Sequence, residues 1–212
     1  EYRKRLGAEL ANESHVQSDL VIPVPDSGVP AAIGYAEAIN KNVELGIIRN
    51  HYVGRTFIEP TQKIRSLGVK LKHSINKTLI KNKSVILIDD SLVRGTTSIK
   101  IIKMLYEAGA KEVHLRISSP PIKYPDYYGI DTPTEKELLA SKMSIKEMEK
   151  FINATTLNFL SLEGLYKSMG YEKRNPTYPQ FTDHCFTGDY PVKPIDANDK
   201  NFLETQLTLM SS

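Results

Sequence analysis

Apolar residues in the first 118 positions form short continuous runs, separated by stretches in which apolar residues recur at helical spacing. A run without polar alternation is typical of a strand that is buried on both faces. Such runs lie at residues 20–25 and 85–88, and two further strand-like segments, in which polar residues or glycine interrupt the apolar ones, lie at residues 43–48 and 113–117. Residues 29–39 and about 96–108 have the helical spacing, and Gly109 is placed to end the second helix. The alternation predicts an α/β fold, with a mostly parallel twisted sheet and helices on both faces.

The pattern becomes less regular beyond Ser119. Residues 134–150 are predicted to be helical, because Thr134 and Glu137 have the spacing of a capping box. Residues 157–160 are predicted to form a short strand, and residues 162–169 a short helix that ends at a glycine.

The last part of the chain is rich in proline and has little periodicity. We therefore expect one domain over residues 1–170 and an irregular extension over residues 171–212. Such an extension is expected to lie along the surface, or to be ordered only against another domain.

The apolar run at residues 85–88 ends in two adjacent carboxylates, Asp89 and Asp90. Open α/β sheets bind their ligands at the carboxyl ends of strands. The turn that follows offers hydroxyls, backbone N–H groups and a helix N-terminus, which together suit a phosphate. Its candidate residues are Ser91, Arg94, Gly95, Thr96 and Thr97. An Asp-Asp pair alone is often a solvated turn, and Gly-Thr-Thr alone is often a helix cap. Their combination within residues 85–97 favours a binding site.

A second candidate segment is basic and long. Residues 50–70 contain glycine, proline and ionisable side chains, and connections of this length are usually binding loops or lids. Cations in and beside it are Arg49, Arg55, Lys63, Arg65, Lys70 and Lys72. Such a group is usually a solvated surface, but a polyanionic substrate would give it a function. His51 and His73 flank the loop without metal-binding spacing, which favours surface or phosphate-adjacent positions.

Composition excludes several classes of protein. The chain has 212 residues and a formal net charge of +3, which does not by itself indicate a nucleic-acid partner. No apolar run approaches the roughly 18 residues that span a membrane, and there is no signal-peptide pattern. The single cysteine, Cys185, excludes an internal disulfide and fits a reducing compartment. We therefore expect a cytoplasmic protein. Because the sequence does not begin with methionine, we also expect it to be a fragment or a processed product.

The segment at residues 85–97 resembles the phosphoribosyl diphosphate (PRPP) motif of type I phosphoribosyltransferases. Other segments are similar to the amidophosphoribosyltransferase family within that group, over roughly residues 1–190. These segments are residues 24–36, 52–60, 128–131 and 159–165. The Gly54-Arg55-Thr56-Phe57 block is specific to this family, whereas the Asp-Asp turn is shared by the wider superfamily.

The resemblance implies the type I phosphoribosyltransferase fold and a reaction. Ammonia displaces pyrophosphate from C1 of PRPP and gives 5-phosphoribosylamine, the first step of purine biosynthesis. Asp89 and Asp90 are then expected to bind the ribose hydroxyls and, with Ser27, a Mg²⁺ ion. The turn at residues 91–97 is expected to hold the 5-phosphate.

Pyrophosphate is expected to bind the loop formed by Asp26, Ser27 and Gly28, where the glycine permits close approach. The resemblance assigns catalysis to positioning and charge neutralisation rather than to a covalent intermediate. The implied catalytic residues are Arg49, Tyr52, Arg55 and Lys72. Arg49 and Lys72 stand where the family has pyrophosphate-binding lysines, so Arg49 is a departure that preserves charge.

Two other features of the family are not matched. Its full-length enzymes carry an N-terminal glutaminase domain that supplies ammonia, and no segment here resembles it. That domain and further copies of the chain are the expected protein partners. One subgroup binds an iron–sulfur cluster through four cysteines; with Cys185 alone, no such cluster is expected. His184 and Cys185 are adjacent, but no base or acid can be placed beside them from the sequence, so catalysis there is not predicted.

Two alternative functions remain. A salvage phosphoribosyltransferase acting on a nucleobase would share the PRPP motif, although no base-binding hood is recognisable. A non-catalytic PRPP-binding regulator would need a helix-turn-helix or a strongly basic face, and neither is found.

Overall fold

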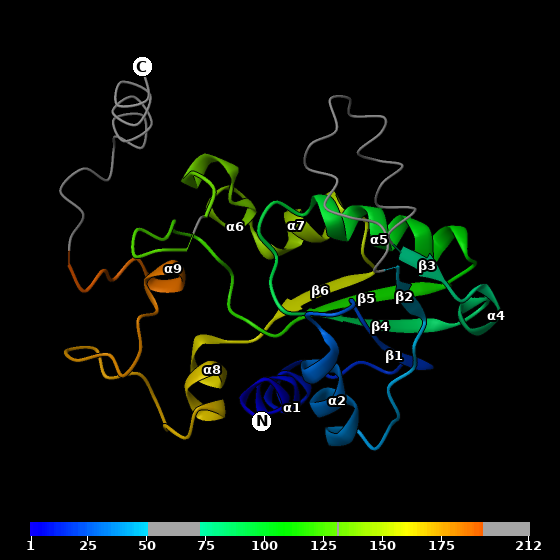
Figure 1. Ribbon diagram of the computed structural model, residues 1–212, viewed down its shortest axis with the longest axis horizontal. Coiled ribbons are helices and arrows are strands. Elements are labelled where there is room, and N and C mark those ends of the chain that lie inside the picture. Colours follow the sequence, from blue (N-terminus) through cyan, green and yellow to red (C-terminus); the bar gives the residue numbers. More distant parts are fainter. Residues whose placement is uncertain (51–72, 131, 193–212) are drawn as a thin grey trace.

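A parallel sheet lies between two layers of helices in the computed structural model, which describes residues 1–50, 73–130 and 132–192 (Figure 1). The four strands have the order β1-β4-β5-β6, and each neighbouring pair is parallel. They are β1 (Leu20–Pro23), β4 (Ser84–Asp89), β5 (Glu112–Ile117) and β6 (Thr156–Phe159). The predicted α/β fold is confirmed, and each strand of this sheet lies within a residue or two of its predicted range.

The central strand β4 explains why helices cover both faces. Val85 and Leu87 belong to the apolar core on one face, and Ile86 and Ile88 to the core on the other, all with no exposed surface. Burial of each such side chain contributes about 1.5–3 kcal/mol. Helices α5 (Thr96–Glu107) and α7 (Ile145–Ile152) cover the first face. Helices α1 (Tyr2–Ser14) and α2 (Val29–Ala38) cover the second, and α8 (Leu162–Ser168) packs beside α1 (Figure 1).

Helices α1 and α2 cross at very short range. A Cβ atom on Gly7 would lie 1.8 Å from the carbonyl oxygen of Ala31, and one on Gly34 would lie 1.8 Å from that of Lys4. Only glycine permits this crossing at either position. The contact fixes α2, and α2 in turn fixes the loop at residues 26–28 that precedes it.

A two-stranded antiparallel ladder stands beside the sheet. It consists of β2 (Ile47–Arg49) and β3 (His73–Ile75), and it places Arg49 opposite His73. The predicted strand at residues 43–48 is therefore only partly formed, and Val43 makes a single bridge to Val21. The short helix α4 (Lys77–Ile80) follows β3, and the Asn76 side chain accepts a hydrogen bond from the Leu79 N–H at its start. The predicted loop at residues 50–70 lies almost wholly outside the described residues.

The prediction of one helix over residues 134–150 is wrong. The capping box of Thr134 and Glu137 is present, but it begins only the 3-10 turn η2 (Glu135–Glu137). The four-residue helix α6 (Leu139–Lys142) follows, and Met143 is extended. Ser144 and Glu147 then form a second capping box that begins α7. Two helix starts so close together interrupt the helix.

The segment at residues 171–192 is irregular apart from α9 (His184–Thr187), as predicted. It is not ordered only against another domain, because its buried Asp183 accepts hydrogen bonds from the Tyr166 hydroxyl at 2.7 Å and from Arg174 Nε at 2.6 Å. Tyr166 belongs to α8, so the segment is fastened to the domain itself. Within the described part of the chain, no helix has the length and apolar character needed to cross a membrane.

Candidate functional site

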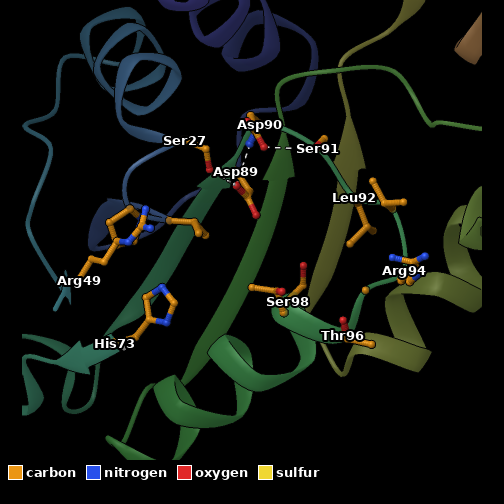
Figure 2. A pocket seen from close by; sticks show the side chains of 15 residues that line it. Ser27, Arg49, His73, Asp89, Asp90, Ser91, Leu92, Arg94, Thr96 and Ser98 are labelled. Atoms are coloured by element: carbon orange, nitrogen blue, oxygen red, sulfur yellow. Dashed lines mark hydrogen bonds between the residues drawn. The ribbon is translucent and has the colours of Figure 1, made fainter. Parts of the chain in front are cut away.

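The loop after β1 and the turn after β4 meet at the carboxyl edge of the sheet, where they enclose a cavity of about 370 Å³ (Figure 2). Parallel strands bring their carboxyl ends to the same edge, so segments more than sixty residues apart in sequence become neighbours here. The lining residues are Val24, Pro25, Ser27, Arg49, His73, Asp89, Asp90, Ser91, Leu92, Val93, Arg94, Gly95, Thr96, Thr97 and Ser98.

Asp89 is the central carboxylate of this cavity. Its Oδ1 accepts a hydrogen bond from the Ser27 hydroxyl at 3.2 Å and one from the Asp90 N–H at 2.9 Å, while Ser91 donates to Asp90 Oδ1 at 3.1 Å. Burial, followed by the charge of Asp90, raises the pKa of Asp89 to about 7. Two carboxylates and a hydroxyl are oxygen donors of the kind that Mg²⁺ prefers. The residues predicted to hold the metal are therefore brought together.

The β2–β3 ladder adds positive charge on the other side of the cavity. Arg49 Nη1 donates to Asp26 Oδ2 at 2.8 Å, and among the described residues the buried Arg49 Nε has no hydrogen-bond partner. His73 is 7% exposed and faces the cavity beside Arg49 (Figure 2). The sequence left open whether His73 lies at the surface or next to a bound phosphate. Its buried position beside the cavity favours the second.

Gly28, in the loop after β1, is required by the packing of that loop. A Cβ on Gly28 would lie 2.3 Å from the carbonyl oxygen of Ile88, so the approach of this loop to β4 already requires glycine. Asp26 and Gly28 belong to the loop but do not line the cavity. The Pro25–Asp26 peptide bond is cis.

The turn after β4 forms the opposite wall and leads into α5. Gly95 has φ +73°, and a Cβ there would lie 2.6 Å from Leu139 Cδ1, so this position requires glycine. The first N–H groups of a helix have no acceptor within it, and the α5 N-terminus borders the cavity. Arg94 lies at the rim, where its Nε pairs with Glu137 Oε1 at 3.1 Å.

Three of the predicted catalytic residues, Tyr52, Arg55 and Lys72, lie outside the described residues. Six lining residues were not predicted as site residues: Val24, Pro25, His73, Leu92, Val93 and Ser98. The sequence could have indicated Ser98, because it directly follows two predicted phosphate-binding threonines. For His73, the only indication in the sequence was its position at the end of the basic loop.

A second polar cluster contains the acid that could not be placed from the sequence. Asp126 Oδ2 lies 2.6 Å from His184 Nε2 and 3.8 Å from Cys185 Sγ. Burial, followed by the charge of Asp126, raises the pKa of the Cys185 thiol to about 11. A thiol that keeps its proton is a poor nucleophile.

Comparisons with known proteins agree with this geometry. Residues 3–124 match the family of phosphoribosyl transferase domains, and the chain belongs to that family. More closely, it is similar to amidophosphoribosyltransferases. It is 56% identical over 211 residues to that of Rhizobium etli, an alignment that covers 99% of this chain and 42% of the relative. It is 52% identical over 200 residues to the chloroplastic amidophosphoribosyltransferase 1 of Arabidopsis thaliana, with 94% and 34% covered.

A solved structure gives the same answer. Glutamine PRPP amidotransferase from Bacillus subtilis, complexed with ADP and GMP, superposes with a TM-score of 0.80 at 53% identity. The match covers 90% of this chain and 42% of that one. The chain thus spans less than half the length of these relatives.

Proposed function

We propose that this chain is the phosphoribosyl-transferring part of an amidophosphoribosyltransferase. It would join ammonia to C1 of PRPP and release 5-phosphoribosylamine and pyrophosphate, the first step of purine biosynthesis. One observation carries the proposal: a hydroxyl, two carboxylates and a helix N-terminus line one cavity at the ends of β1 and β4. That set suits a sugar that carries a diphosphate on one carbon and a phosphate on another, as PRPP does. The family assignment is consistent with such a ligand.

The proposed roles follow from the distribution of charge around the cavity. Asp89 and Asp90 bind the ribose hydroxyls, and together with Ser27 they are the groups that would hold Mg²⁺. The metal, when bound, neutralises charge on the departing pyrophosphate. The turn at residues 91–97 binds the 5-phosphate through backbone N–H groups and hydroxyls.

Arg49 is the proposed partner of the pyrophosphate among the described residues. The C1–O bond breaks with positive charge developing on the ribose and negative charge on the leaving group, so a cation beside that group lowers the barrier. To act there, Arg49 must exchange its bond to Asp26 for one to the ligand. By resemblance, Tyr52, Arg55 and Lys72 have the same task.

The setting of the domain is part of the proposal. We place the end of the transferase domain after residue 170, with residues 171–192 fastened to it through Asp183. In the whole protein, a glutaminase domain would supply ammonia and copies of the chain would associate. A cytoplasmic location is favoured by the single cysteine.

The test is PRPP-dependent release of pyrophosphate in the presence of Mg²⁺. Ammonium chloride, glutamine and a mixture of nucleobases are supplied separately to the isolated chain. We expect turnover with ammonium chloride that rises with pH, because ammonia and not ammonium has the lone pair that attacks C1. Turnover with nucleobases alone would instead identify a salvage enzyme. PRPP binding without turnover on any nitrogen source, together with a PRPP-dependent DNA shift, would identify a regulator.

A further inference from the structure

Three potential metal ligands lie close together outside the cavity at the ends of β1 and β4, and none of them lines that cavity. Asp126 lies in the coil after β5, and His184 and Cys185 lie in α9. One ligand atom from each of the three residues lies within 4.8 Å of the other two. Asp126 is 5% exposed and His184 is 3% exposed, while Cys185 is partly buried and free of any disulfide. We call these residues the Asp-His-Cys cluster.

Asp126 is held in a fixed orientation by the backbone that follows it. Its Oδ1 accepts hydrogen bonds from the Tyr128 N–H at 2.8 Å and the Ile130 N–H at 2.9 Å. These bonds leave Oδ2 directed toward His184 and Cys185. A carboxylate whose second oxygen is bonded in this way is the usual arrangement of an oriented metal ligand.

The other two ligands are also held before any metal arrives. The His184 ring packs edge-on against Tyr128 with ring centroids 4.9 Å apart, and it packs against Tyr190 at 5.0 Å with the two ring planes tilted by 31°. The Cys185 carbonyl accepts hydrogen bonds from the N–H groups of Lys123 and Tyr124, which fastens α9 to the coil (Figure 1). The cluster therefore loses little conformational entropy on binding an ion.

Only one ring nitrogen of His184, Nε2, faces another potential metal ligand, Asp126. Among the described residues, the buried Nδ1 of His184 has no hydrogen-bond partner. The imidazole is thus held by packing and by Asp126, on the side where the thiol also lies.

We propose that Asp126, His184 and Cys185 bind a single Zn²⁺ ion. Thiolate and imidazole ligands favour Zn²⁺ over Mg²⁺ or Ca²⁺, and one cysteine is too few for an iron–sulfur cluster. The charge also balances, since a divalent ion with one carboxylate, one thiolate and a neutral imidazole has no net charge, as a buried site requires.

Zinc bonds of about 2.0–2.3 Å separate tetrahedral ligand atoms by roughly 3.3–3.8 Å. The observed spacings of 2.6 and 3.8 Å about Asp126 Oδ2 lie within a small adjustment of that geometry.

Binding releases one proton from the cluster and moves another. Zn²⁺ displaces the thiol proton of Cys185 into solvent, and the His184 proton moves from Nε2 to Nδ1. A water molecule completes four ligands. The ion would join α9 to the coil at residues 123–130, so the site stabilises the segment at residues 171–192 rather than taking part in phosphoribosyl transfer.

The test measures metal directly in the full chain. Protein purified from zinc-supplemented medium is analysed for metal content, and metal-free protein is titrated with Zn²⁺ and with Co²⁺. We expect about one ion per chain, and a thiolate-to-Co²⁺ charge-transfer absorption in the near ultraviolet. Asp126→Asn, His184→Gln and Cys185→Ser should each weaken zinc binding by more than about tenfold, the loss seen even for groups that only orient ligands. The charge-transfer absorption should vanish in Cys185→Ser.

Asp126→Asn keeps an acceptor for the Tyr128 and Ile130 N–H groups, so it separates loss of metal from loss of folding. His15→Gln removes an exposed histidine and is the matched control, with unchanged binding expected. The proposal is overturned if the wild-type chain takes up neither ion. It is also overturned if Cys185→Ser keeps the Co²⁺ absorption, or if the three cluster variants and the control bind equally.

Discussion

The Ser27 hydroxyl donates a hydrogen bond of 3.2 Å to Asp89 Oδ1 and so joins the loop after β1 to the last residue of β4. Around this bond, burial and the neighbouring charge of Asp90 raise the pKa of Asp89 to about 7. The fold therefore holds a carboxylate whose ionised form it destabilises. A carboxylate in this position is suited to a ligand that binds together with a cation, because the cation stabilises the ionised form.

The first prediction is that Asp89→Asn stabilises the ligand-free protein at about pH 8. The pKa of Asp89 in the folded state lies above its unfolded value of 3.8, so ionisation costs stability as the pH rises from about 4 to 7. A shift of about three units corresponds to about 4 kcal/mol as an upper bound. Asparagine keeps the acceptor for Ser27 and Asp90. Thermal unfolding should show a higher Tm at about pH 8 and a smaller gain near pH 4; a lower Tm at both would contradict the prediction.

The second prediction concerns binding by the same carboxylates. Asp89→Asn and Asp90→Asn should each weaken binding of Mg²⁺–PRPP by about tenfold or more, since each removes a charge from the proposed metal and ribose site. Calorimetric titration measures the affinity, and Glu37→Gln, which alters an exposed carboxylate on α2, is the control. Wild-type affinity in both variants would remove these residues from the site.

The third prediction is that Arg49→Ala lowers kcat/KM by roughly 10- to 100-fold. Its ion pair with Asp26 is partly exposed, so stability should change by less than about 1 kcal/mol. The kcat/KM of Arg49→Lys should lie between those of the wild type and Arg49→Ala, because lysine keeps the charge but not the planar guanidinium. Lys4→Ala, which breaks an exposed pair with Glu37 remote from the cavity, should leave kcat/KM unchanged. Equal kinetics for Arg49→Ala and the wild type would exclude a role in catalysis.

The fourth prediction separates phosphate binding from catalysis. Thr97→Val keeps the shape of an exposed side chain in the first turn of α5 but removes its hydroxyl. A hydrogen bond to a charged group contributes about 1.5–3 kcal/mol, so the KM for PRPP should rise by about tenfold or more while kcat changes little. Initial rates at varied PRPP concentration measure both constants. A fall in kcat at constant KM would assign Thr97 to the reacting centre instead.

Strands β1 and β4 were predictable because they are buried on both faces and so appear as continuous apolar runs, whereas β5 has apolar residues only at alternate positions and buries His114 and Arg116 between them. The helix over residues 134–150 was not predictable, although Ser144 and Glu147 already had the spacing of a second capping box. A helix start inside a predicted helix is a sequence signal for a break. The first capping box alone did not define the length of its helix.

The candidate site was predictable where it consists of strand ends. Ser27, Asp89 and Asp90 lie at or just after the ends of parallel strands, and such strands end at a common edge. His73 and Asp126 belong to the other case. His73 reaches the cavity through pairing with β2 across a long connection, and Asp126 meets His184 over 58 positions of sequence. Neither contact follows from local periodicity, because only the tertiary fold brings these residues together.

The last prediction tests what fastens residues 171–192 to the domain. Asp183 is 3% exposed and accepts hydrogen bonds from Tyr166 and from both Nε and Nη2 of Arg174. Burial alone would raise the pKa of Asp183, but these bonds outweigh it and hold the pKa below its usual value. Asp183→Ala leaves a buried hydroxyl and a largely buried guanidinium without this partner, so the free energy of unfolding should fall by about 3–5 kcal/mol.

Urea denaturation at neutral pH measures that loss. Asp189→Ala is the matched control, because it removes a half-exposed carboxylate that bonds the same guanidinium and should cost less than about 1 kcal/mol. A carboxyl with a depressed pKa stabilises the fold above its unfolded pKa, and this contribution is lost as the pH falls through the folded value. The difference between wild type and Asp183→Ala should therefore shrink in acid. Equal losses for the two variants at neutral pH would show that Asp183 does not fasten the segment.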